Sequence, residues 1–60
     1  MAAIDAFDNY LNTLSAEDKE KLKTFIAEQR AEMLAARSED ARVRLTHEFI
    51  EEVRQRLRQK

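Results

Sequence analysis

The chain has 60 residues, of which 38% are charged, a net charge of −1, and no cysteine, glycine or proline. This length allows one domain, residues 1–60, with a marginal core, and the lack of cysteine excludes disulfides as a further source of stability. The near balance of charge argues against a general nucleic-acid binder, and the dominance of helix-forming residues predicts an all-α fold.

The composition also predicts where the protein works. The first residues contain no basic segment followed by an apolar run, and no apolar stretch approaches the roughly 18 residues of a membrane span. Acidic residues in the C-terminal segment oppose its binding to anionic lipid headgroups. We therefore expect a cytoplasmic protein that has no membrane partner.

The first predicted element is a short amphipathic helix over residues 3–13. Ile4, Phe7 and Leu11 recur at i, i+3 and i+7, which is the spacing of one helical face. Thr13 is a poor interior helix residue, so the helix is expected to end there. A helix this short is marginal alone, and we expect it to pack across one end of a helical hairpin formed by the rest of the chain.

The second predicted helix covers residues 16–36 and starts after Ser15. The Ser15 hydroxyl can accept a hydrogen bond from an N–H of the first turn, and Asp18 occupies the acidic position of a capping box. The apolar residues that share one face of this helix are Leu22, Phe25, Ile26 and Met33.

Ser38 marks a predicted break between the second helix and the third. A straight continuation would displace the two apolar faces by roughly 130° around the axis, so one rod would point them in different directions. Serine caps helices, and Glu39 and Asp40 suit a first turn. Two helices of similar length with a tight connection predict an antiparallel hairpin, and hence three helices in all.

The third predicted helix, residues 39–58, has the widest apolar surface in the sequence. Its apolar residues cover an arc of roughly 160°, against roughly 100° for an ordinary surface helix. One neighbouring helix cannot cover this arc, so we expect the helix to lie between two neighbours, either within this chain or across a dimer. The apolar surface left over is expected to pair with a second copy in a helical bundle or with a helix of another protein. The residues predicted for that interface are Val43, Leu45, Phe49, Ile50, Val53 and Leu57.

No catalytic, metal or cofactor site is predicted. His47 is the only histidine, and with Glu51 one turn away it supplies two metal ligands where a site needs three or four. Ser15 and Ser38 are explained as helix caps, and without glycine the chain has no glycine-rich loop to hold a phosphate. A chain this small has little room for a catalytic pocket, so we expect a protein that is not an enzyme.

These patterns favour a small protein–protein interaction or regulatory module that acts by helix packing as a homodimer. The alternative is a small DNA-binding regulator whose basic C-terminal helix contacts phosphates, with binding that weakens steeply with salt. Acidic residues interleaved with the basic ones, and basic residues pointing around the helix, argue against this alternative. The basic residues concerned are Arg42, Arg44, Arg54, Arg56 and Arg58, followed by Lys60.

Overall fold

The computed structural model describes residues 2–58, so the predicted basic residue Lys60 lies outside the described part of the chain. Residues 2–58 form four α-helices and no strand. The predicted all-α class is therefore confirmed, whereas the predicted number of three helices is wrong. The helices are α1 (Ala3–Asn12), α2 (Ala16–Lys21), α3 (Lys23–Ala35) and α4 (Glu39–Arg58).

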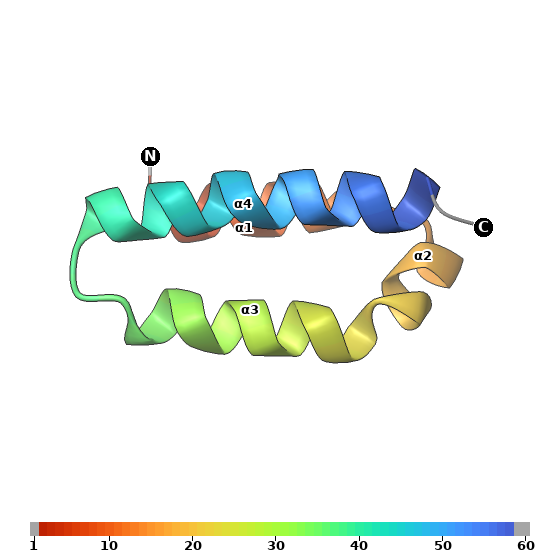
Figure 1. The fold of residues 1–60 in the computed structure, drawn as a ribbon, viewed down its shortest axis with the longest axis horizontal. Helices are drawn as coiled ribbons and strands as arrows, with labels where there is room; N and C mark the ends of the chain where they lie inside the picture. The colour runs from red at the N-terminus through yellow and green to blue at the C-terminus, as the bar shows by residue number, and fades with distance from the viewer. Residues whose placement is uncertain (1, 59–60) are drawn as a thin grey trace.

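The fourth helix arises because the predicted helix 16–36 bends at Leu22. Leu22 has φ −104° and ψ 13°, which ends α2 and starts α3. Hydrogen bonding continues through the bend, since the Leu22 N–H donates to the Asp18 carbonyl at 3.1 Å and the Leu22 carbonyl accepts from Ile26 at 2.8 Å. The Leu22 side chain is buried, so the bend keeps this residue in the core while α2 turns the chain at the end of the bundle (Figure 1).

Helices α3 and α4 run antiparallel, as the hairpin prediction requires, and α1 lies along α4 in the same direction (Figure 1). The expectation that the first helix crosses one end of the hairpin is wrong. The apolar residues of α1 recur along its whole length, so the helix buries more surface beside α4 than across its tip. The result is an elongated three-helix arrangement of 35 × 17 × 16 Å with α2 at one end.

Phe49 is the centre of the core. Its ring lies 4.4 Å from the ring of Phe7 and 6.1 Å from that of Tyr10, measured between centroids, which joins α4 to α1. On the other side the ring of Phe25 stacks on it at 5.6 Å, which joins α4 to α3. Phe7, Phe49, Met33 and Val53 are the largest fully buried side chains among the described residues.

Polar groups at the ends and inside of the bundle are paired. The buried Thr46 hydroxyl donates to the Arg42 carbonyl at 2.9 Å, so its burial leaves no unmet hydrogen bond. At the start of α1, the Ala3 N–H donates to Glu39 Oε2 at 2.6 Å. A carboxylate of α4 therefore caps α1, because the residue before α1 is alanine and has no side-chain acceptor.

The break predicted at Ser38 is present, since α3 ends at Ala35 and α4 begins at Glu39. The Ser38 hydroxyl accepts a hydrogen bond from the Ala41 N–H at 3.2 Å. Ser15 plays the predicted capping role for α2, accepting from the Asp18 N–H at 3.1 Å.

We expect Ser38→Ala to lower the free energy of unfolding by about 1 kcal/mol, the usual effect of losing an N-cap acceptor. Ser38→Asp keeps an acceptor at the same place and should stay near the parent. Urea unfolding followed by circular dichroism measures both. Equal stability of the two variants would show that the cap does not hold this helix end.

Candidate functional site

The structure divides the six residues predicted for an interface into two groups. Phe49 and Val53 are exposed by only 1% and 0%, because α1 and α3 of the same chain cover them. They offer no surface to another protein while this fold persists. Leu45, Ile50 and Leu57 are partly buried against the core, and Val43 keeps 42% of its surface exposed.

Val43 and Ile50 line a groove of about 280 Å³ between α1 and α4. We call this the α1–α4 groove. Its α1 side is built from alanines, whose small side chains allow another helix to approach closely. The sequence reasoning missed these alanines, although Ala2 and Ala6 stand at the i, i+4 spacing of one helical face. The complete lining is Ala2, Ala3, Ala6, Val43, Thr46, His47 and Ile50.

Charged side chains continue the α1–α4 groove along the exposed edge of α4. They are Asp40, Arg44, Glu51 and Arg54, all exposed. None of the four forms an ion pair with any residue of the described range 2–58. Four other charges of α4 are paired, since Arg42 lies 3.3 Å from Glu39 and Arg56 lies 3.0 Å from Glu52. The exposed edge therefore carries opposite charges that the chain does not use internally.

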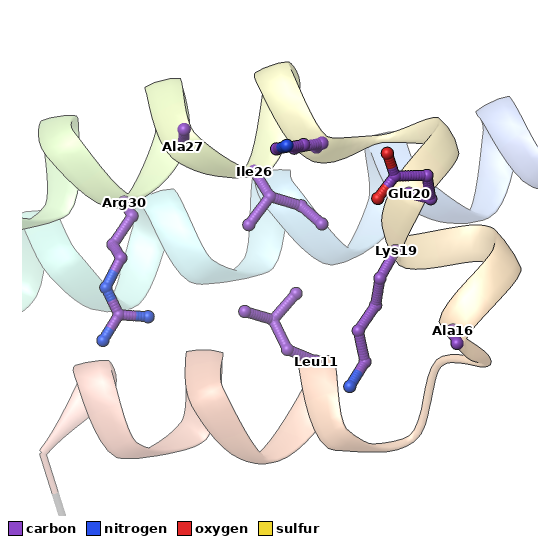
Figure 2. A pocket seen from close by; sticks show the side chains of 8 residues that line it. Leu11, Ala16, Lys19, Glu20, Ile26, Ala27 and Arg30 are labelled. Atoms are coloured by element: carbon purple, nitrogen blue, oxygen red, sulfur yellow. The ribbon is translucent and has the colours of Figure 1, made fainter.

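A larger groove of about 520 Å³ lies between α1 and α3. Figure 2 shows Leu11 and Ile26 pointing toward one another across it, with Arg30 reaching from α3 and Lys19 from α2. Arg30 bridges the two helices by an ion pair with Asp8. The lining carries the cations Lys19, Lys23 and Arg30 against one acid, Glu20, and this positive balance opposes the pairing of two copies through it. The complete lining is Leu11, Ala16, Lys19, Glu20, Lys23, Ile26, Ala27 and Arg30.

The five arginines proposed for phosphate contact do not form one basic surface. Arg42 donates to the Ala36 carbonyl at 2.8 Å and pairs with Glu39, so it holds the connection between α3 and α4. Arg56 stacks over the ring of Phe25 at 4.2 Å while paired with Glu52. The three arginines without an ion pair among the described residues are Arg44, Arg54 and Arg58, and all three are exposed. At 100° per residue they share the outer face of α4 with Asp40 and Glu51, so that face has mixed charge.

His47 is exposed and lies at the α1–α4 groove. Among residues 2–58, no group of three or more His, Cys, Asp or Glu side chains lies close enough to hold a metal ion. Within the same range, no helix combines the length and apolar character needed to cross a membrane. The features that distinguish this surface are thus apolar contact area and charge. Comparisons with protein-family models, with curated proteins and with solved structures gave no match to this chain.

Proposed function

We propose that this protein is a small interaction module that binds a helical partner in the α1–α4 groove. The observation that carries the proposal is the position of Val43, an exposed apolar residue beside Ile50 and a row of alanines. The deeper apolar residues of α4 are already covered by α1 and α3. Of what remains of its wide apolar face, Val43 and Ile50 lie at this groove.

The shape of the α1–α4 groove favours a helix as the partner. The two helices that form it run in one direction (Figure 1), and the groove follows α4 from Val43 to Ile50. An amphipathic helix presents apolar side chains at i, i+3, i+4 and i+7, and such a row can fill a groove of this kind. The alanines of α1 set a low wall on one side, so the partner backbone can come close to Val43 and Ile50.

The size of the α1–α4 groove implies a reversible complex. Contacts limited to one helical face bury less than the roughly 1,200–2,000 Å² of a standard stable interface. Burying the exposed part of Val43 and Ile50 contributes about 25 cal/mol per Å² of apolar surface. Charged residues at the edge then add specificity and speed of association more than affinity.

Site-specific photo-crosslinking in cells tests the proposal. A photoreactive amino acid replaces Val43 in one variant and Leu34 in the other, because Leu34 is also apolar and is 70% exposed but lies on α3 away from the groove. We expect a discrete covalent adduct from position 43 and none from position 34. Equal adducts from both positions, or none from position 43, would contradict the proposal.

Nucleic-acid binding stays an alternative predicted from the sequence alone. The pairing of Arg42 and Arg56 within the chain, and the acids beside the other three arginines, leave no observation in the described residues that favours it. The regulatory role and the cytoplasmic location likewise stay predictions.

A further inference from the structure

We infer that the partner in the α1–α4 groove is a second copy of this chain, bound with its α4 antiparallel to the first. This inference rests on the proposed function, since it uses the same groove. It adds the identity of the partner, the direction of its helix and the residues that meet.

One face of α4 carries a row of residues that we call the outer row. At 100° per residue these side chains span an arc of roughly 120°, with His47 at its middle. Asp40 lies seven residues before His47 and Arg54 seven residues after it. Arg58 shares this face but lies beyond the stretch that is symmetric about His47, so the outer row is taken from residue 40 to residue 54. Its members are Asp40, Val43, Arg44, His47, Ile50, Glu51 and Arg54.

The outer row becomes complementary to itself when it is reversed about His47. Two antiparallel helices related by a two-fold axis at His47 set Asp40 of each copy opposite Arg54 of the other. The two oppositely charged contacts that result are equivalent by symmetry. The row therefore has the charge order that an isologous antiparallel pair needs.

The remaining four residues of the outer row also match, because residues on one side of the row face residues on the same side in the second copy. Val43 and Ile50 lie on the side of the row next to α1, so these two apolar residues meet across the axis. Arg44 and Glu51 lie on the opposite side, toward solvent, and meet there with opposite charge. Apolar contact is thus placed beside the alanines of α1, and the charges are placed at the edge.

Two other ways of pairing two copies bring like charges together. A parallel arrangement would set Asp40 against Asp40 and Arg54 against Arg54, which is unfavourable. Pairing through the larger groove between α1 and α3 would bring the rims of Lys19, Lys23 and Arg30 together. Opposite charges meet at both ends of the outer row only in the antiparallel pair on α4.

Asp40 and Arg54 cannot satisfy each other within one chain. They are 14 residues apart on one straight helix, which is about 21 Å at 1.5 Å per residue. Neither forms an ion pair with another residue in the described part of the chain. A change at one position that compensates a change at the other must therefore act between two chains.

The test is a charge exchange, measured by sedimentation velocity at low salt over a range of concentrations. Asp40→Arg alone would set Arg against Arg54 twice, and Arg54→Asp alone would set Asp40 against Asp twice. We expect each single variant to dissociate at least roughly tenfold more readily than the parent. An equal mixture of the two variants, and the double variant, should regain the parent association. Glu28→Arg on the exposed side of α3 makes the same charge change as Asp40→Arg and should have no effect.

Asp40 stands in the first turn of α4, where an acid stabilises the helix, so substituting it also affects helix stability. Disulfide formation is a second measurement, and at position 47 it does not depend on that acid. The chain has no cysteine, so one introduced cysteine can form a disulfide only between chains. We expect His47→Cys to form a disulfide dimer rapidly, because position 47 lies on the two-fold axis. Asp40→Cys and Arg54→Cys should crosslink slowly alone and rapidly when mixed.

The outcomes separate the inference from the proposed function. A parent chain that stays monomeric while its position 43 crosslinks to a different protein would overturn the second copy as partner and leave the interaction module standing. The antiparallel arrangement would be overturned if the single charge variants associate as well as the parent. It would also be overturned if Asp40→Cys forms disulfide dimers as fast as His47→Cys. Recovery in the mixed sample together with rapid His47→Cys crosslinking would support it.

Discussion

Replacing Phe49 by alanine is expected to unfold most of the chain. Phe49 is exposed by only 1%, and its ring contacts the aromatic rings of Phe7, Tyr10 and Phe25. These rings belong to α1 and α3, so one side chain connects all three long helices. Deleting it removes apolar contact from α1 and α3 at the same time.

The stability that this substitution removes is about as large as the stability of the whole fold. A buried Phe→Ala substitution costs about 3–5 kcal/mol, and a core of this size supplies only about 3–5 kcal/mol in total. We therefore expect Phe49→Ala to lose its cooperative thermal transition and much of its helicity by circular dichroism. Leu34→Ala is the matched control, because Leu34 is 70% exposed, and it should melt like the parent. A cooperative transition in Phe49→Ala close to that of the parent would refute the central role of this residue.

The helices themselves were predictable where local chemistry determines them. Ser15 and Ser38 are followed by acids, and both cap helices in the structure. The bend at Leu22 was not predictable, because the sequence around it has neither glycine nor proline and continues the helical pattern. Burial of Leu22 against the rest of the bundle fixes that bend, and burial of this kind depends on contacts between distant segments.

The sequence predicts a wide apolar face on α4 but leaves open whether this chain or a second one covers it. A helical pattern shows how much surface must be buried, and it does not show which neighbour buries it. Helix α1 lies along α4 and not across one end, so it covers Phe49 together with α3. Of the predicted interface, Val43 and Ile50 are the two that line the α1–α4 groove. The self-complementary order of charges is visible in the sequence, but it has meaning only once the outer face of α4 is known.

Phe7→Ala is expected to release α1 from the bundle and to abolish association with it. Phe7 is fully buried, and its ring lies 4.4 Å from that of Phe49. Its removal should cost about 3–5 kcal/mol, close to the whole stability of a domain of this size. The alanines that form one side of the α1–α4 groove would move away with α1. We therefore expect folding and association to be lost together.

The competing explanation is that the ion pair between Asp8 and Arg30 holds α1. Both side chains are substantially exposed, at 40% and 44%, and exposed pairs contribute only about 0.2–1 kcal/mol. Asp8→Asn should therefore keep the parent helicity and association, whereas Phe7→Ala loses both, as measured by urea unfolding and sedimentation. If Asp8→Asn were the more damaging change, charge and not apolar contact would position α1. The packing of α1 on the bundle, followed by helicity, would then weaken as salt is raised. If Phe7 is the anchor, this packing should not change with salt, because salt does not screen buried apolar contacts.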